Sequence, residues 1–385
     1  MQAEFFWRIP MHGDGRTVFS AQWNRGDWKP EKPNSIAHGG ADGFTYFDYA
    51  AQVARAVELA GFDGALIPTD LTGDEPLAMA AALARETRRL RMMTAFQPGF
   101  LSPAYAAKMS ATIQRISGNR LDWNIITGGS APAQRAYGDT LPHDERYART
   151  GEWLEVIAGL WAGAPFSHSG KLYQVEGGGL TRPLNATRKP GVYFSGASEA
   201  ALEVAARQAD YYMMWAEPLA DMRASMERLN GMAAVHGRTM RYGLRIDLFA
   251  RETEEAAWAE ARRLWDTVDP DAPRKPNPMT SAGGADSVGA QRQAALRAAA
   301  STFDDYVIGP NLWAGLGAVR AGPTVGIFGS YQQVADRLMD YVEAGFGNFI
   351  LAANPHLEEA LRIGEEVLPR VRQRLGEAAV PRAAE

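Results

Sequence analysis

The sequence predicts an α/β fold, a (β/α)8 TIM barrel with inserted segments. Three observations support this interpretation. Short apolar segments alternate with amphipathic helical segments along almost the whole chain. No strong hairpin signal interrupts that alternation, so the strands are expected to be parallel. Residues 191–217 show the pattern most clearly, as strand, turn, helix and strand, and such a βαβ unit requires a parallel sheet. An open, doubly wound sheet is the alternative.

Each expected strand is a short apolar or aromatic segment bounded by glycine, proline or polar residues. In order, the expected strands are Phe5–Pro10, Gly64–Thr69, Leu90–Gln97, Leu121–Thr127, Val192–Ser195, Tyr211–Trp215, Tyr242–Arg251 and Phe349–Ala353. The expected helices show apolar periodicity, and some begin at residues that suit a helix start, such as Pro103 and Ser198. They are Phe44–Gly61, Pro76–Thr87, Pro103–Ile116, Arg146–Trp161, Ser198–Gln208, Pro218–His236, Glu254–Thr267, Tyr331–Ala344 and Pro355–Leu375.

Three segments break the alternation and are interpreted as insertions into one domain that spans residues 1–376. They lie at about residues 20–43, 165–185 and 268–324, and the first is too long for a simple turn. Lys171–Val175 is expected to form a strand outside the barrel, and Ala290–Ala300 a helix within the third insertion. Val325–Phe328 is a further short apolar stretch. Residues 377–385 are rich in Ala, Pro and Glu and are expected to fray.

The composition excludes several classes of function. The chain has 385 residues, of which 46% are hydrophobic and 22% charged, so it can bury a large core. A net charge of -5 without a basic stripe argues against a nucleic-acid partner. The absence of cysteine excludes disulfides and thiolate chemistry. No signal peptide or long apolar run is present, and no cluster has metal-ligand spacing, so we expect a cytoplasmic enzyme without membrane contact or metal.

A phosphate site is expected where the fifth strand leads into its helix. Gly196 and Ala197 carry almost no side chain, and Ser198 follows at the N-cap position with Glu199 in the first helical turn. Such a turn leaves backbone N–H groups free and directs the positive end of the helix dipole at one point. It suits a phosphate monoester. An ordinary capped helix is the alternative interpretation.

Barrel enzymes carry their chemistry at the C-terminal ends of the strands, where small polar and aromatic residues dominate in this chain. Such a rim suits a planar cofactor that carries out the redox chemistry. Arg245 lies inside an apolar strand and therefore needs an anion, either Asp247 two residues on or an anionic substrate. The residues that follow the strands are His12, Pro68, Thr69, Gln97, Thr127, Ser195 to Ser198, Trp215, Arg245, Asp247, Asn354 and His356.

Three more side chains are candidates for cofactor contacts. Asn124, on the fourth strand, can offer its amide to the edge of a heterocycle or can be a satisfied polar residue of the barrel interior. Arg146 and Tyr147, in the segment HDERYAR, can direct a guanidinium or a phenol to the phosphate, although an arginine at a helix start is usually solvated.

Several long segments resemble those of the bacterial luciferase-like flavin monooxygenases, and among these the FMNH2-dependent alkanesulfonate monooxygenases. They include FFWRIPMHGDG, ALIPT, SPAYAAKMSATIQRISGNRLDWNIITGG, YFSGASEAALEVAARQADYYMMWAEP, RYGLRIDLFARETEEAAW, GPNLWAGLGAVR and NPHLEEALRIGEEVLP. These segments span nearly the whole chain in the same order as in the family.

The resemblance implies a two-component system in which a separate NAD(P)H-dependent reductase supplies reduced FMN. The monooxygenase then uses O2 to cleave a carbon–sulfur bond of an organic sulfonate, releasing sulfite and an aldehyde. The assembly states that are usual in the family imply a homodimer or homotetramer. Transferred residue by residue, the flavin contacts are Ile67, Pro68, Asn124, Arg146, Tyr147 and Ser198, with Thr127, Gly196 and Ala197 beside them. Substrate and oxygen chemistry is assigned to His12, Trp215, Arg245 and His356, with Asp247 and Asn354 in the same pocket.

The chain departs from the family pattern at four places. Asp247 stands where the alkanesulfonate enzymes have histidine, Asn354 where they have tyrosine, and Gly73 where they have cysteine; residues 298–302 lack a clear match for an arginine. Asp247 and Asn354 suit a polyhydroxylated substrate, so a sugar sulfonate such as sulfoquinovose is a candidate. A sulfone, a heterocycle or an alkane as substrate, a non-catalytic flavin-binding or sulfonate-binding barrel, and a deazaflavin-dependent hydride-transfer enzyme are the alternatives.

Overall fold

Eight parallel strands close into a barrel, as the sequence predicts. The computed structural model describes residues 2–11, 46–69, 73–128, 131–266, 287–298, 301–319 and 322–376. Every neighbouring pair in the ring is parallel, and the pairing of β8 with β9 closes it. The ring consists of β1 (Glu4–Arg8), β2 (Gly64–Ile67), β3 (Arg91–Phe96), β4 (Leu121–Ile125), β7 (Val192–Phe194), β8 (Tyr211–Trp215), β9 (Arg241–Arg251) and β13 (Phe346–Ala352). The open-sheet alternative is therefore wrong.

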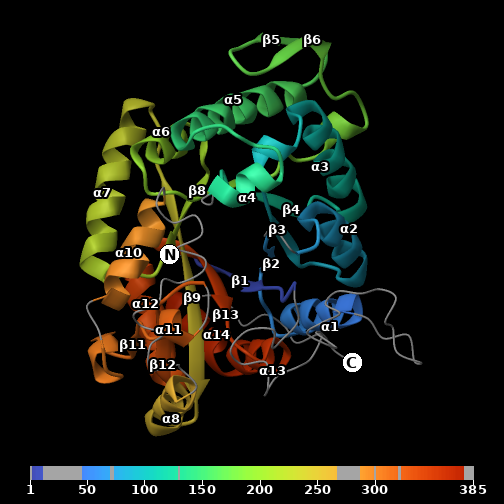
Figure 1. Cartoon of the computed structure of the whole chain (residues 1–385). Helices are drawn as coiled ribbons and strands as arrows, with labels where there is room; N and C mark the ends of the chain where they lie inside the picture. Colours follow the sequence, from blue (N-terminus) through green and yellow to red (C-terminus); the bar gives the residue numbers. More distant parts are fainter. Residues whose placement is uncertain are drawn as a thin grey trace.

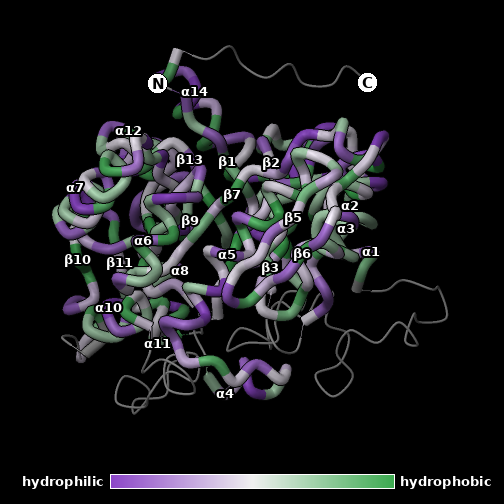
Figure 2. The backbone as a smooth tube through the Cα atoms, turned by 90° about the horizontal axis from the view of Figure 1, so that it is seen from above, coloured by the Kyte–Doolittle hydropathy of each residue, from purple (hydrophilic) through white to green (hydrophobic). Residues whose placement is uncertain are grey.

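Helices surround the ring, with α2 and α3 on one side and α6 and α7 on the other (Figure 1). Figure 2 shows the same arrangement from above, with β1, β7 and β9 in the middle of the molecule. None of the helices in the described ranges combines the length and hydropathy that crossing a bilayer requires. The outer helices are α1 (Tyr46–Leu59), α2 (Pro76–Glu86), α3 (Pro103–Ser117), α5 (His143–Ala162), α6 (Glu199–Gln208), α7 (Leu219–Val235), α12 (Tyr331–Glu343), α13 (His356–Arg362) and α14 (Leu368–Leu375).

The insertions contain secondary structure that the sequence pattern did not predict. Instead of a single strand at Lys171–Val175, β5 (Phe166–Ser169) and β6 (Gln174–Gly178) form an antiparallel hairpin beyond α5 (Figure 1). The stretch at Val325–Phe328 is a strand, β12 (Gly326–Ser330), which pairs in parallel with the last residues of β9. β11 (Leu312–Trp313) and β10 (Val307–Gly309) extend this side sheet antiparallel. α8 (Glu254–Trp265) and α10 (Val288–Ala298) lie where helices were predicted at Glu254–Thr267 and Ala290–Ala300, and α11 (Leu316–Val319) is additional. The insertion expected at residues 20–43 and residues 267–286 of the third insertion lie outside the described ranges.

Two apolar layers follow from the alternation of side chains along the strands. Phe6, Leu66, Met93, Met213 and Ile350 form a cluster inside the barrel, whereas their strand neighbours belong to the larger core under the helices. Position within the alternation therefore decides whether a strand residue faces the barrel interior or the helices.

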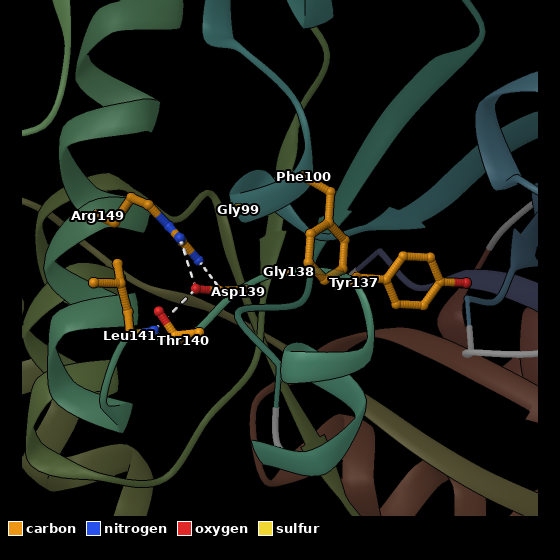
Figure 3. Close-up of a pocket in the computed structure, with 8 residues that line it drawn as sticks. All are labelled: Gly99, Phe100, Tyr137, Gly138, Asp139, Thr140, Leu141 and Arg149. Atoms are coloured by element: carbon orange, nitrogen blue, oxygen red, sulfur yellow. Dashed lines mark hydrogen bonds and ion pairs between the residues drawn. The ribbon is translucent and has the colours of Figure 1, made fainter.

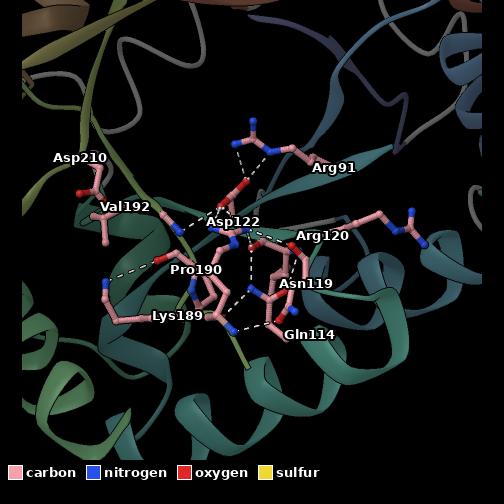
Figure 4. A network of polar contacts seen from close by, with 12 residues as sticks. Arg91, Gln114, Asn119, Arg120, Asp122, Lys189, Pro190, Val192 and Asp210 are labelled. Atoms are coloured by element: carbon pink, nitrogen blue, oxygen red, sulfur yellow. Dashed lines mark hydrogen bonds and ion pairs between the residues drawn. The ribbon is translucent and has the colours of Figure 1, made fainter. Parts of the chain in front are cut away.

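A polar network closes the end of the barrel where the strands begin (Figure 4). The fully buried carboxylate of Asp122 accepts hydrogen bonds from Nε and Nη2 of Arg91 at 2.9 and 2.7 Å. It also accepts from both Nη atoms of Arg188 at 3.0 Å and from the Gly191 N–H at 2.9 Å. Arg91 reaches Glu4 as well, at 2.5 Å. These contacts satisfy the buried charges and leave the opposite end of the barrel for a ligand.

We predict that Asp122→Asn lowers the free energy of unfolding by about 3 kcal/mol, because it leaves Arg91 and Arg188 without their shared buried counterion. Chemical denaturation measures the change. Glu203→Gln is the control, since the Glu203–Arg207 pair is exposed, with side-chain exposures of 44% and 60%. Its loss should cost less than about 0.5 kcal/mol. Equal costs for the two variants would contradict the structural role of the network.

Candidate active site

The mouth of the barrel contains an ion pair between two neighbouring inward positions of β9. Nη1 of Arg245 donates a hydrogen bond of 2.5 Å to Oδ1 of Asp247, and both residues are buried. Among the residues that the structure describes, Asp247 accepts the hydrogen bond of this guanidinium. Burial lowers the pKa of Arg245 to about 9, so the guanidinium carries its charge at neutral pH. Of the two anions expected for Arg245, the structure shows the internal one, and this pairing leaves other N–H donors of the same guanidinium for a ligand.

Trp215 and Asn354 lie at the same end of the barrel as this pair. Trp215 ends β8 and pairs in register with Arg245, and the Ala216 N–H donates to the Arg245 carbonyl at 3.2 Å. Asn354 follows β13 and is half-buried. The structure thus brings Trp215, Arg245 and Asp247 together on adjacent strands, with Asn354 at the next strand end.

Asn124 presents an unsatisfied polar atom to the barrel interior. The residue is 8% exposed, and its Oδ1 is buried without a hydrogen-bond partner. A buried amide oxygen without a partner is costly, so the expectation of an internally satisfied residue does not hold for this atom. It lies on β4, between β3 and the strand β7 that leads to the phosphate turn. The position fits a ligand that offers a hydrogen-bond donor.

The turn after β7 forms a tight cradle. Gly196 has φ of +140°, and a Cβ there would lie 2.6 Å from Oη of Tyr147, so only glycine fits. The Gly196 carbonyl accepts a hydrogen bond of 2.7 Å from the phenol of Tyr212. Ser198 caps α6 by accepting from the Ala201 N–H at 3.3 Å, and it also hydrogen-bonds Tyr147. Burial raises the pKa of Tyr147, so its phenol stays a neutral donor.

Arg146 lies in the first turn of α5, at the same rim. Its side chain is buried, and it donates to the carbonyl of Leu141 at 2.8 Å and of Gly128 at 3.3 Å. Its Nε is buried without a hydrogen-bond partner. Thr127 contacts the same helix, since its hydroxyl lies 3.2 Å from that of Thr150. The predicted phosphate ligands Arg146, Tyr147 and Ser198 therefore meet at the ends of β4 and β7.

Aromatic packing places α5 so that its first turn reaches this rim. Trp153 of α5 contacts Phe96 and Trp123 edge-on, with ring centroids 5.5 and 6.0 Å apart. Trp161, further along α5, meets Trp123 at 5.8 Å. The helix begins at His143, three residues before the expected start, which puts Arg146 inside the first turn.

The connection from α4 (Ala131–Ala136) to α5 lines a cavity of about 500 Å³ beside the rim (Figure 3). Asp139 anchors this connection because its two carboxylate oxygens accept from Arg149 at 3.0 and 2.5 Å. The cavity is bounded on its other side by Gly99 and by Phe100, whose ring lies 5.0 Å from that of Tyr137. The Leu141 N–H of the same connection donates to Oδ1 of Asp139 at 3.2 Å, so the Asp139–Arg149 pair helps to hold the carbonyl that accepts from Arg146.

The described helix of the third insertion packs against the end of β8. Gln293 of α10 is buried, donates to the Ala216 carbonyl at 3.1 Å and accepts from the Thr324 N–H at 3.0 Å. Arg292 lies 3.6 Å from Glu217, and burial raises the pKa of that carboxyl while Arg292 opposes the rise. These contacts fix the backbone that carries Trp215.

Not every predicted site residue faces the mouth. The side chain of Ile67 belongs to the core under the helices, and Pro68 follows it half-buried at the rim. His356 is buried, and its ring packs edge-on against Trp7 at 6.0 Å, on the helix side of β1. His12 lies outside the described residues. The roles assigned to these residues stay predictions. In the described ranges no group of three His, Cys, Asp or Glu is arranged to hold a metal ion.

Sequence reasoning missed the residues that support the rim from a distance. Tyr212, Asp139, Arg149 and Gln293 each hold a backbone segment of the site through contacts that span many residues of the chain. Asp139 and Arg149 are ten residues apart, and no helix or strand periodicity in the sequence marks them as a pair. Tyr212 points out of the barrel toward the carbonyl of Gly196. This contact could be recognised only after the strand pairing was known.

We predict that Gly196→Ala disrupts the cradle, because the new Cβ would displace Tyr147 and require a φ of +140°. The affinity for FMN, the cofactor that the family resemblance implies, should fall at least about tenfold, measured by FMN titration. Gly237→Ala is the matched control, since φ there is also positive, +65°, and nothing lies within 4 Å of the new Cβ. Unchanged FMN binding by Gly196→Ala would exclude this turn as the phosphate site.

The fold agrees with comparisons to known proteins. A family model described as luciferase-like monooxygenase matches residues 29–348. A riboflavin lyase crystallised with modified FMN and riboflavin is similar with a TM-score of 0.74 and 21% identity, over 100% of this chain and 94% of that chain. A long-chain alkane monooxygenase is similar with a TM-score of 0.73 and 20% identity, over 99% and 93% of the two chains.

Another solved structure of similar fold is described as dependent on a different coenzyme, F420. An F420-dependent secondary alcohol dehydrogenase is similar with a TM-score of 0.64 and 17% identity, over 97% of this chain and 100% of that chain. At these identities the solved structures establish the fold alone. The family model covers most of the sequence, and so the chain belongs to the luciferase-like monooxygenase family.

Proposed function

We propose that this protein is a two-component monooxygenase that uses reduced FMN and O2 to cleave the carbon–sulfur bond of a small polar organic sulfonate. The observation that carries the proposal is Arg245, a buried guanidinium at the mouth of a luciferase-like barrel. A sulfonate is a weakly hydrated anion whose oxygens match guanidinium donors. Trp215 on the adjacent strand supplies an apolar wall for the remainder of the substrate.

The chain offers a separate set of residues for FMN. Ser198, Tyr147 and Arg146 would hold the phosphate at the α6 N-terminus, where the dipole favours an anion. Asn124 would accept a hydrogen bond from the flavin ring, which satisfies the amide oxygen left without a partner. The cradle at Gly196 fits a phosphate because it has no side chain.

When bound, reduced FMN supplies two electrons for the activation of O2. One oxygen atom ends in the aldehyde and the other in water, while the carbon–sulfur bond breaks and sulfur leaves as hydrogensulfite. The protein's part is to hold the sulfonate with Arg245 and to exclude water with Trp215. Asp247 fixes the guanidinium through Nη1 and can accept a hydrogen bond from a substrate hydroxyl, which supports a sugar sulfonate. A separate NAD(P)H-dependent reductase would supply the flavin. We also propose that the protein forms a homodimer or homotetramer, as the family resemblance implies.

Sulfite release tests the reaction. Purified protein with supplied reduced FMN and O2 is assayed on a panel of alkyl and sugar sulfonates, including sulfoquinovose, and omission of either FMNH2 or O2 should abolish sulfite. Arg245→Gln should lower kcat/KM for the best sulfonate about a hundredfold, because a charged hydrogen-bond donor to the substrate is lost. FMN affinity and the unfolding temperature serve as controls for folding. Sulfite release that is unaffected by Arg245→Gln would contradict the anion role.

The phosphate site has its own test. Arg146→Met should weaken FMN binding by about tenfold or more and leave riboflavin binding within about twofold, because only FMN carries the phosphate. Fluorescence titration of oxidised flavins measures both affinities. Equal weakening for the two flavins would show that Arg146 acts through the structure of α5 instead of through the phosphate. Binding of coenzyme F420 in preference to FMN would favour the hydride-transfer alternative.

The Arg245–Asp247 pair also favours a second candidate, a monooxygenase acting on an uncharged substrate such as a sulfone or a heterocycle. The carboxylate neutralises the guanidinium at 2.5 Å, so this pair alone gives the pocket no net charge. Oxidation of a neutral sulfone in the same assay, without turnover of any sulfonate, would support this candidate. Binding of flavin and sulfonate without any product would instead indicate a binding protein.

A further inference from the structure

We propose that Gln97 and Gln134 recognise the ring of the flavin, Gln97 as a hydrogen-bond donor to a ring carbonyl and Gln134 as the residue that positions it. The inference rests on the proposed function, because it requires a flavin at the mouth of the barrel. It deepens that function by assigning one edge of the ring, where an N–H group lies between two carbonyl groups, to the ends of β3 and β4.

The strand alternation places Gln97 on the inner face of the barrel mouth. Met93 and Ala95 of β3 belong to the apolar cluster inside the barrel. Gln97 continues this alternation because its backbone is extended, with φ of -108° and ψ of 115°. The Ile126 N–H donates to the Phe96 carbonyl at 3.0 Å, so β3 and the end of β4 stay paired up to this point. Gln97 is half-buried there.

Gln134 of α4 fixes the direction of the Gln97 amide. Its Nε2 donates a hydrogen bond to Oε1 of Gln97, and Gln134 is 2% exposed. The amide of Gln134 also lies against Gly128 at the end of β4, where a Cβ would collide with it. Gly128 has φ of +102°, a conformation that favours glycine. The amide is therefore held between the ends of two neighbouring strands.

The direction of this hydrogen bond determines what Gln97 offers to a ligand. A side-chain amide has an acceptor oxygen and an NH2 donor group, and here the oxygen accepts from Gln134. Within the described part of the chain, Gln134 is the hydrogen-bond partner of the Gln97 side chain. Nε2 of Gln97 is consequently the group that remains for a ligand.

Asn124 offers the opposite polarity on the adjacent strand. It pairs in register with Ala95, so it lies two positions deeper in the barrel than Gln97. Its Oδ1 is buried and has no hydrogen-bond partner among the residues described. An acceptor and a donor on neighbouring strands match a ring edge on which N–H and carbonyl groups alternate. Riboflavin and FMN share this edge, so the two amides recognise the ring and the phosphate site distinguishes FMN.

A buried atom of Gln134 supports its positioning role. Its Oε1 has no hydrogen-bond partner in the described ranges, although the residue is almost fully buried. Such an atom costs free energy that a methionine of similar length would avoid. A buried polar group that remains unsatisfied calls for a function, and the contact with Gln97 supplies one.

A structural bridge between β3 and α4 is the alternative role, and the two roles predict different losses. Gln134 lies against Gly128, whose carbonyl accepts from Nη2 of Arg146 at 3.3 Å. Damage to a bridge would therefore disturb the phosphate ligand and weaken FMN binding more than riboflavin binding. Loss of a contact with the ring weakens both flavins by the same factor.

The test measures the affinities for oxidised FMN and riboflavin by fluorescence titration. Gln97→Met removes the donor and keeps the length of the side chain, so it should weaken both flavins equally, by about threefold to tenfold. A hydrogen bond lowers the stretching frequency of a carbonyl group. Infrared difference spectra of bound FMN should therefore show one ring carbonyl band at higher frequency in Gln97→Met, which a bridging role would not cause.

Gln134→Met tests the positioning role, because it removes the donor that fixes Oε1 of Gln97. The free amide can then turn either end to the ring, so both affinities should fall by less than in Gln97→Met. The double variant should bind both flavins as Gln97→Met does, since Gln134 acts through Gln97. Additive losses in the double variant would contradict this dependence.

Gln208→Met is the matched control. Gln208 is a half-buried glutamine at the end of α6 opposite the phosphate turn, and its Nε2 donates to the Gly151 carbonyl at 3.0 Å. Both affinities should stay within about twofold of the wild-type values. Unfolding temperatures confirm that all variants fold.

Three results overturn the inference: a larger loss for FMN than for riboflavin in Gln97→Met, an unshifted carbonyl band, or a wild-type protein that binds neither flavin. If Gln97→Met weakens both flavins and shifts the band but no sulfonate yields sulfite, the proposed reaction fails while the ring contact stands. If sulfite is released and Gln97→Met leaves both affinities within about twofold, this inference fails while the reaction stands.

Discussion

The rest of the structure depends on the pairing of β9 with strands on both of its sides. Pairing with β8 and β13 closes the ring and removes every edge of the barrel sheet. β9 is longer than its neighbours, and its last residues leave the ring to pair with β12. Asp247 lies where the partner changes, level with Ala352 on one side and Gly326 on the other. The Arg245–Asp247 pair is thereby fixed on rigid backbone at the mouth.

Parallel pairing also sorts the buried charges by function. Because all eight strands run in one direction, charged residues near their starts gather at one end, where Arg91, Asp122 and Glu4 satisfy one another. Charged residues near the strand ends gather at the mouth, where Arg245 and Asp247 pair with each other. The first set stabilises the barrel, and the second lies at the end where barrel enzymes carry their chemistry. The same alternation that fills the interior with Phe6, Met93 and Met213 decides which charges reach it.

The candidate site could be predicted in part. The turn from Gly196 to Ser198 consists of neighbouring residues, so its helix-capping pattern could be recognised from the sequence. The structure confirms the cap. Arg146 and Tyr147 were proposed beside it, but their meeting with that turn depends on the docking of α5 through Trp153. The side chains of Ile67 and His356 face the helices, which the sequence did not predict. A position at a strand end or a helix start does not specify the direction of the side chain.

The sequence by itself determined the eight barrel strands, their order and the parallel sheet, because hydrophobic periodicity and βαβ spacing are local properties. It placed the start of β13 three residues late, since Gly347 and Asn348 have weak strand propensity. Asn348 joins the strand through pairing with Glu4 of β1 and Gly243 of β9, and Gly347 lies at a register shift of the pairing with β9. Tertiary structure alone decided that β12 adds to β9, that Asp122 closes one end, and that Arg245 is paired within the protein. Those outcomes depend on contacts between residues distant in the chain, which no local pattern encodes.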